Sequence, residues 1–405
     1  MAVRLRWIGI TYLAVSVPLA VWLLPTGREQ PPVEFAAPHH APVWGPATMP
    51  IADARRLAIR QARVWQQPDP STELASNPRD PAGTLSEPIV RCRYLPGPAH
   101  GTTAKFDCVL RDGEVVKVKY GHTGEIHAEV AATRLLTALG FGADRMYLIP
   151  RLRCYGCVRT PFYTMWALDY VHARDVLTRS IPGDSFSDFE WVAVERRFPG
   201  SEIKNGNTNG WAWYELDAID AARGANRAER DALRLAAVLL AHWDNKAANQ
   251  RLVCGDDEQR PEDGPPEGGH HVQEGPPEGG HYERNGACKR PFAYVDDLGS
   301  TFGPNKLDFD RWKNAPIWKD ARACAVSMKS FPYDGGTFQD VRISEAGRQL
   351  IARELKALDD PRLAALFASA RFPQFLGSNP SADAHAWAAA FLDKVRQIEA
   401  AGPCE

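Results

Sequence analysis

The chain has 405 residues, of which 44% are hydrophobic and 24% charged, so global disorder is excluded and one large or two ordinary domains fit its length. Its 48 basic and 50 acidic residues give a net charge of −2, which provides no basic field, and we expect no nucleic-acid partner. No long repeat runs through the chain, which makes solenoids and propellers an unlikely class.

The N-terminus carries an apolar run of 18 residues, Trp7 to Leu24, that follows Arg4 and Arg6. As a helix it would be about 27 Å long, close to the thickness of a bilayer core. Small residues that would form a cleavage site do not follow it, so we predict an uncleaved signal anchor over residues 1–28. The arginines favour a main domain outside the cytoplasm, in a periplasm or lumen. A cleaved signal peptide with secretion, or a buried helix, is the alternative.

The eight cysteines fit an oxidising compartment, where an even number indicates disulfides. Cys92 and Cys108 flank one Gly/Pro-rich loop, and Cys254 and Cys288 bracket a low-complexity insertion, so each pair is a candidate disulfide. The C-x-x-C at 154–157 fits a tight disulfide, a redox pair or half of a zinc site.

The first half of the chain reads as strand-rich. Residues 29–88 are expected to form a Pro-rich tether and linker with a short helix at 51–64, and residues 89–198 an N-terminal lobe. Strands are expected at 89–95, 105–120 with a hairpin turn at Asp112-Gly113, 146–152, 162–170 and 189–197, with one helix at 124–139 that ends at Gly140.

Helix signals dominate the remaining residues, 199–405. Asn226 and Glu229 form a capping-box pattern before an apolar helix, and further helices are expected at 344–357, 360–371 and 381–400. A low-complexity insertion at 255–287 contains two copies of a Gly/Pro/Glu/His repeat. Its histidines fit either metal binding or a repeat-expanded loop without chemistry: His270, His271 and His281.

The segment HWDNKAANQ places Asp244 and Asn249 five residues apart after the apolar helix. This spacing matches the catalytic loop of protein kinases, H-R-D-x-x-x-x-N. The chemistry needs such a pair, because a carboxylate orients the acceptor hydroxyl and takes its proton, while a neutral amide oxygen helps to hold a magnesium ion.

Four more segments resemble kinase elements. Ala293 to Gly299 (AYVDDLG) resembles the metal-binding D-F-G element and delivers Asp297. In EVVKVKYG, Lys117 and Lys119 share one strand face, and we favour Lys119 as the phosphate-binding lysine because a turn follows it. The next helix supplies Glu129 as its partner. The loop 96–103 lies where a phosphate-covering loop belongs, with the candidate residues Gly97, Gly101 and Thr102.

The order of these elements resembles the protein-kinase-like superfamily, in an atypical branch near the HipA, spore-coat CotH and secretory-pathway Four-jointed-type kinases. The phrases GTTAKFD, KVKYG and AHWDNKAANQRL also resemble uncharacterised bacterial proteins of this kind. The resemblance covers about residues 89–310. It implies an α+β, two-lobed protein-kinase-like fold, with a strand-rich N-lobe, a helical C-lobe, and ATP with Mg²⁺ or Mn²⁺ as cofactors.

By this resemblance Asp244 is the catalytic base, Asn249 and Asp297 are metal ligands, and Lys119 anchors phosphates with Glu129 as its partner. Two features depart from the family: Trp243 replaces the arginine of H-R-D, and no A-P-E segment is found. The peptide-docking region and the substrate therefore do not carry over.

The sequence predicts a kinase-like phosphotransferase that acts on a hydroxyl of a protein or glycan. Three alternatives stay open: a nucleotidyl transferase on the same fold, a catalytically inactive pseudokinase that serves as an envelope binding module, and a thiol redox protein that uses Cys154 and Cys157.

Overall fold

The computed structural model describes residues 24–46, 49–98, 101–170, 172, 181–204, 210–255, 283–284, 288–303, 306–328, 338, 340–375 and 383–404. The predicted signal anchor lies outside the described residues except for its last five, 24–28, and so do His270, His271 and His281. Among the described helices, none has the length and apolar character that a membrane crossing requires.

The fold is mixed α+β, and the chain forms two compact units, each made of three segments. Unit 1 comprises Met1–His39, Arg79–Ile126 and Tyr147–Arg196, and unit 2 comprises His40–Pro78, His127–Met146 and Arg197–Glu405. The sequence-based boundaries at 88/89 and 198/199 describe continuous lobes and stay a prediction. Each compact unit combines three separate segments, so the chain crosses between the units several times. Such crossings leave no local signal in the sequence, because they are set by which distant segments pack together.

Unit 1 is built on a six-stranded sheet with the order β1-β7-β5-β4-β3-β6, and β6 also pairs with β7, so the sheet closes on itself. Its interior is apolar and aromatic, with Phe106, Tyr120 and Phe189 in mutual ring contact. The strands are β1 (Gly27–Arg28), β3 (Val90–Leu95), β4 (Lys105–Leu110), β5 (Val115–Lys119), β6 (Arg145–Tyr155) and β7 (Ser185–Arg196).

The segment predicted as a tether is hydrogen-bonded to unit 1 along much of its first part. The N–H of Glu29 donates to the carbonyl of Asp184 at 2.8 Å, directly after β1, which belongs to the predicted anchor and pairs antiparallel with β7. Further on, the N–H of His39 donates to the carbonyl of Gly113 at 2.8 Å. Proline-rich sequence therefore forms an extended edge here, because proline sits readily in extended backbone at a sheet edge.

The strand predicted at 162–170 is wrong, because these residues form helix α4 (Pro161–Tyr170). Pro161 occupies the first turn, where its fixed φ favours a helix and its missing N–H costs nothing. Phe162 and Met165, three residues apart, are buried in the core of unit 1, and the N–H of Phe162 donates to the hydroxyl of Tyr120 at 3.0 Å. Packing of these side chains in the core therefore outweighs the strand propensity of the aromatic residues.

Unit 2 contains a five-stranded sheet that the sequence reading did not predict, with the order β10-β2-β8-β9-β11. Strands β9 and β11 pair antiparallel, and the Cys254–Cys288 disulfide links the end of β9 to the segment just before β11. The strands are β2 (Val43–Pro46), β8 (Ser201–Ile203), β9 (Gln250–Cys254), β10 (Glu283–Arg284) and β11 (Pro291–Val295).

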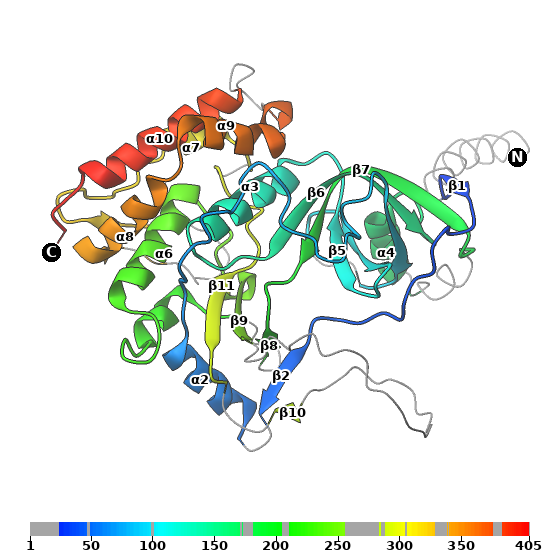
Figure 1. Ribbon diagram of the computed structural model, residues 1–405, viewed down its shortest axis with the longest axis horizontal. Helices are drawn as coiled ribbons and strands as arrows, with labels where there is room; N and C mark the ends of the chain where they lie inside the picture. Colours follow the sequence, from blue (N-terminus) through cyan, green and yellow to red (C-terminus); the bar gives the residue numbers. More distant parts are fainter. Residues whose placement is uncertain are drawn as a thin grey trace, which may run out of the picture. The chain divides into compact units, whose positions relative to one another are not determined.

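Helices make up most of the rest of unit 2, and α6 packs on α8 while α10 packs on α9 and α8 (Figure 1). Their core is aromatic, with Phe302, Trp312 and Trp387 in ring contact. The predicted C-terminal helices are present. The helices are α2 (Ile51–Gln61), α3 (Gly124–Ala138), α6 (Arg227–Leu240), α7 (Phe309–Asn314), α8 (Glu345–Leu355), α9 (Asp360–Ser369) and α10 (Ala384–Ala400). The first three residues of α3 belong to the second segment of unit 1, which ends at Ile126.

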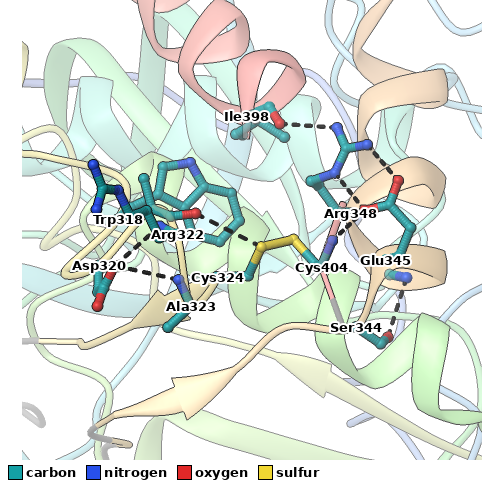
Figure 2. Close-up of a disulfide and its surroundings, with 12 residues drawn as sticks. Trp318, Asp320, Arg322, Ala323, Cys324, Ser344, Glu345, Arg348, Ile398 and Cys404 are labelled. Carbon is teal, nitrogen blue, oxygen red and sulfur yellow. Dashed lines mark hydrogen bonds and ion pairs between the residues drawn. A yellow bond between two sulfur atoms is a disulfide. The ribbon is translucent and has the colours of Figure 1, made fainter. Parts of the chain in front are cut away.

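All eight cysteines form disulfides, which are Cys92–Cys108, Cys154–Cys157, Cys254–Cys288 and Cys324–Cys404. The last one links the C-terminal tail to Cys324, just before β12 (Ala325–Val326), and the tail also contacts the start of α8 (Figure 2). The N–H of Cys404 donates to Glu345 Oε2 at 2.9 Å, and Arg348 pairs with the same carboxylate. The Arg348 guanidinium and the Cys404 amide together lower the pKa of Glu345 to about 2.

Candidate functional site

The Asp-x4-Asn loop starts where α6 ends. Asn226 and Glu229 form the predicted capping box, because each side chain accepts from the main-chain N–H of the other, at 3.1 and 3.0 Å. At the other end Ala241 takes a left-handed conformation, with φ of 49°, and turns the chain out of the helix. His242 follows directly and is fully buried.

The loop itself is fixed by hydrogen bonds to its main chain. The N–H of Trp243 donates to the carbonyl of Ser300 at 2.9 Å, and Asn245 Nδ2 donates to the carbonyl of His242 at 2.8 Å. Asn249 Nδ2 donates to the carbonyl of Asp244 at 2.7 Å. The loop conformation therefore does not depend on the Asp244 carboxylate, which is only half-buried and left for other contacts.

The β9–β11 pair brings the Asp-x4-Asn loop beside the Asp-Asp-Leu-Gly segment. Asn249 ends the short 3₁₀ turn η2 (Ala247–Asn249), just before β9, and Gln250 is in register with Val295 at the end of β11. The N–H of Asp296 donates to the carbonyl of Asn249 at 3.0 Å. Asn249 and Asp296 are 47 positions apart in the chain, and the antiparallel register makes them neighbours.

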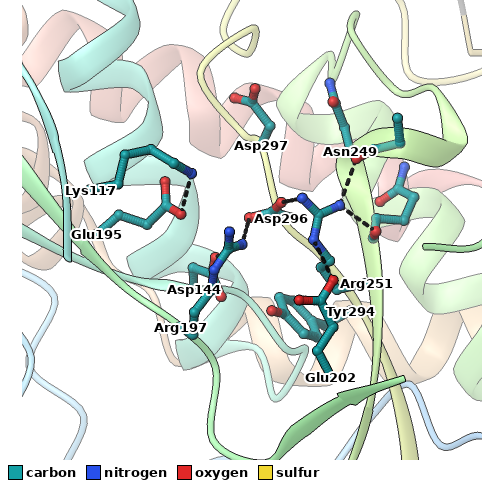
Figure 3. Close-up of polar contacts among 12 residues, drawn as sticks. Lys117, Asp144, Glu195, Arg197, Glu202, Asn249, Arg251, Tyr294, Asp296 and Asp297 are labelled. Atoms are coloured by element: carbon teal, nitrogen blue, oxygen red, sulfur yellow. Dashed lines mark hydrogen bonds and ion pairs between the residues drawn. The ribbon is translucent and has the colours of Figure 1, made fainter. Parts of the chain in front are cut away.

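The two adjacent aspartates have different surroundings (Figure 3). Asp296 is 5% exposed, and it pairs with Arg251 at 2.6 Å and with Arg197 at 3.2 Å. Arg197 also lies 3.3 Å from Asp144. Asp297 is half-buried, and its carboxylate points away from this arginine cluster, as the side chain of Asn249 also does. Asp296 therefore serves the fold, whereas the Asp297 carboxylate lies on the other side of the chain from the two arginines.

His242 connects the two candidate carboxylates electrostatically. Burial lowers the pKa of His242 to about 4, while the negative charges of Asp297 and Asp244 act in the opposite direction. The imidazole is therefore neutral at physiological pH. Both aspartates are thus close enough to act on one ring, and within unit 2 Asp244, Asn249 and Asp297 converge.

Lys246 is a neighbour of Asp244 for which the sequence pattern predicted no role. Its Nζ lies 3.0 Å from Asp244 Oδ1 and 3.1 Å from Oδ2. A partly exposed ammonium at this distance orients the carboxylate and places positive charge beside it. Its position two residues after Asp244 in an extended loop was the signal that could have identified it.

The donor set fits a hard divalent cation. Mg²⁺ and Mn²⁺ prefer oxygen ligands and are commonly held by one or two carboxylates together with substrate phosphates. Asn249 uses its amide nitrogen for the hydrogen bond to Asp244, so its Oδ1 is the atom that remains to bind a cation. Asp297 supplies the carboxylate, because the Asp296 carboxylate is already neutralised by two arginines.

Unit 1 contains the predicted lysine strand. Lys117 and Lys119 share one face of β5, as predicted, and both approach Glu195 of β7. Lys117 Nζ lies 2.6 Å from Glu195 Oε1 (Figure 3). Lys119 Nζ lies 4.0 Å from Glu195 Oε2. Lys119 is 2% exposed, so an anionic partner is needed to stabilise its charge there. The sequence reading missed Glu195, because cross-strand pairing depends on register.

The predicted glycine loop ends beside the lysine strand. Gly101 adopts φ of 80°, which favours glycine, and Lys105 of β4 is in register with Lys119 of β5. Gly97 lies at the other end of the loop, and Thr102 is exposed. Gly101 thus lies close to Lys105, which is opposite Lys119 in the β4–β5 hairpin.

Glu129, the predicted partner of Lys119, lies on α3 and is 1% exposed. Its main-chain carbonyl accepts a hydrogen bond from Thr133 Oγ1 at 2.9 Å. The pairing of Glu129 with Lys119 stays a prediction.

Comparison with known proteins gives a likeness in structure but none in sequence. No protein-family model matches the chain, and no curated protein sequence matches it. Among solved structures the chain is similar to a proinflammatory kinase from Helicobacter pylori, CtkA, with 10% identity and a TM-score of 0.35. The match covers 76% of this chain and 92% of that one.

Proposed function

We propose that the protein is an ATP-dependent phosphotransferase that uses Mg²⁺ or Mn²⁺ and modifies a hydroxyl group of a protein or glycan. The observation that carries the proposal is the convergence of Asp244, Asn249 and Asp297 in unit 2, with Asp296 withdrawn into an arginine cluster. A general base and two oxygen ligands for a hard cation are the parts that phosphoryl transfer to a hydroxyl requires.

In this proposal Asp244 orients the acceptor hydroxyl and accepts its proton. The ammonium of Lys246, 3.0 Å from Asp244 Oδ1, holds the carboxylate in place and adds positive charge where the transferred group carries negative charge. Asn249 and Asp297 would hold the divalent cation, which supplies charge neutralisation for the phosphate oxygens. His242 stays neutral and buried, so it adds no charge that would repel the cation.

The role of phosphate anchor for Lys119 is part of the same proposal. Glu195 Oε2 lies 4.0 Å from Lys119 Nζ and so places a negative charge beside this buried lysine, whose ammonium form is the one that binds phosphate. Lys117, Gly97, Gly101 and Thr102 complete the candidate nucleotide contacts in unit 1.

We further propose that the predicted anchor over residues 1–28 holds the protein in a membrane, with both units outside the cytoplasm. The four disulfides support this location, because disulfides persist in oxidising compartments.

The test is an ATP-dependent labelling assay with the full chain, Mg²⁺ or Mn²⁺, and a panel of envelope proteins and glycans as acceptors. The γ-phosphate and the α-phosphate are labelled in parallel, and mass spectrometry identifies the added group. Label from the γ-position that disappears in Asp244→Asn supports the proposal, with Asp220→Asn as a matched control on the surface of unit 2. Label from the α-position would instead identify a nucleotidyl transferase. Nucleotide binding without any transfer would identify a pseudokinase.

A further inference from the structure

Helix α4 exposes a stripe of large aromatic side chains. Tyr163, Trp166 and Tyr170 are 56%, 63% and 83% exposed, and their spacing of three and four residues places them on one helix face. The opposite face, with Phe162 and Met165, is buried in unit 1. A contiguous exposed aromatic face of this kind marks an interaction surface rather than ordinary surface composition.

The chain enters unit 1 directly after its apolar run. Leu24 is the last residue of the run, and only Pro25 and Thr26 separate it from β1. Thr26 is already fixed, because its N–H donates to the carbonyl of Phe186 at 2.7 Å. If the run crosses a bilayer, no flexible linker lies between the bilayer and β1, and this end of unit 1 is held at the membrane surface.

The start of α4 is tied to the same part of β7 as β1. Ser185 and Phe186 of β7 pair with β1, and the N–H of Gly156 donates to the carbonyl of Ser185 at 2.7 Å. The Ser187 hydroxyl donates to the carbonyl of Cys157 at 3.0 Å. Since α4 begins four residues after Cys157, chain length limits the distance from Thr26 to the start of the stripe to roughly 30 Å.

The chemistry of the stripe favours a lipid headgroup layer. Tyr and Trp combine an apolar ring with a polar atom and concentrate at membrane–water interfaces. Two exposed arginines flank the region, Arg28 in β1 and Arg159 just before α4, and each adds attraction to anionic lipids. Glu29, the acidic neighbour of Arg28, is paired with Arg153 at 2.7 Å.

We propose that the Tyr163–Trp166–Tyr170 face of α4 inserts into the headgroup layer of a phospholipid bilayer and forms a second membrane contact beside the N-terminal run. The inference rests on the proposed membrane anchoring. It adds that unit 1 has a fixed orientation on the membrane, because two contacts restrict rotation about the anchor where one contact does not.

The experiment uses the full chain reconstituted in vesicles of phosphatidylethanolamine and phosphatidylglycerol. Because all native cysteines are in disulfides, Ala167→Cys introduces one reactive thiol next to the stripe, on its face, for a fluorescent label. Tyr214→Cys, at a tyrosine that is 70% exposed in unit 2, is the matched water-exposed control. The label is quenched from the lipid side by nitroxide lipids and from the aqueous side by iodide, and flotation of the vesicles measures membrane association separately.

The expected result is nitroxide quenching at position 167 at least about threefold stronger than at position 214, with weaker iodide quenching. A variant that also carries Tyr163→Ser, Trp166→Ser and Tyr170→Ser should still float, and its label at position 167 should return to the control values. Equal iodide quenching at both positions in floating vesicles would overturn the inference and leave the anchoring intact. Shielding of position 167 from both quenchers would assign the stripe to a protein partner and overturn it too. Protein that fails to float would reject the anchoring and the inference together.

Discussion

The side-chain amide of Asn249 donates a 2.7 Å hydrogen bond to the main-chain carbonyl of Asp244. The proposed metal ligand therefore also supports the loop that carries the proposed base. Its nitrogen and oxygen have separate tasks, which an aspartate at position 249 could not fulfil because it has no amide donor.

Asp244, the proposed base, and Asp297, the proposed metal ligand, should respond differently to substitution. Asp244→Asn should reduce phosphoryl transfer by about 10²–10⁴-fold, the usual worth of a general base, while metal-dependent nucleotide binding is retained. Asp297→Asn should reduce transfer and also metal-dependent nucleotide binding, because a cation ligand is lost. Transfer rates and titration calorimetry with ATP and Mn²⁺ measure the two effects. Equal nucleotide affinity in the two variants would contradict the assignment.

The neighbouring carboxylate should behave in the opposite way. Asp296→Asn removes the buried counter-charge of Arg251 and Arg197, and we expect it to lower the free energy of unfolding by about 2–4 kcal/mol. Asp297→Asn, one residue further, is half-buried and should change the free energy of unfolding by less than about 1 kcal/mol. Urea denaturation of the two variants makes the comparison, and a reversed order would show that Asp297 is the structural aspartate.

The Cys254–Cys288 disulfide should stabilise the pair of strands that positions the site. It spans 34 positions and joins the ends of β9 and β11, so the double variant Cys254→Ser/Cys288→Ser should lose about 3–4 kcal/mol of stability. Because this pair aligns Asn249 with Asp296, metal-dependent nucleotide binding should weaken as well. The variant Cys324→Ser/Cys404→Ser is the control, since it removes a disulfide in the C-terminal tail. Unchanged nucleotide binding in the first variant would show that the hairpin register does not need the disulfide.

The buried Lys394 predicts a pH dependence of stability. Its Nζ donates to the carbonyl of Ala315 at 2.6 Å, and burial lowers its pKa to about 8, below the unfolded value of 10.5. Below pH 8 Lys394 is protonated in both the folded and the unfolded state, and the folded state carries the full cost of burying its charge. As the pH rises from 8 towards 10.5 the folded state loses its proton first, so the contribution of Lys394 to stability should rise by about 2–3 kcal/mol.

Comparison with Lys394→Met isolates this contribution from the titration of other groups. The stability advantage of the variant over the wild-type protein should shrink between pH 7.5 and pH 10, as measured by urea denaturation. A difference that is independent of pH would show that Lys394 keeps its ordinary pKa in the folded protein.

The amino-acid sequence alone determined the features that are formed by residues close together in the chain. The capping box of Asn226 and Glu229, the hairpin at Gly113 and the candidate disulfide Cys92–Cys108 follow from the sequence, because each is formed by residues that are close in the chain. The five-residue spacing of Asp244 and Asn249 is of this kind, and it places both in one loop. For Cys154 and Cys157 the sequence left a disulfide, a redox pair and half of a zinc site open, and they form a disulfide.

Tertiary structure alone decided the features that need a distant partner. It made residues 161–170 a helix, because Phe162 and Met165 fill the core of unit 1. It distinguished Asp296 from Asp297, because the arginines that neutralise Asp296 come from other segments of unit 2. It also placed Glu195 between two lysines through strand register, which no local pattern encodes. Burial and charge pairing across the chain, rather than residue type, gave these side chains their separate tasks.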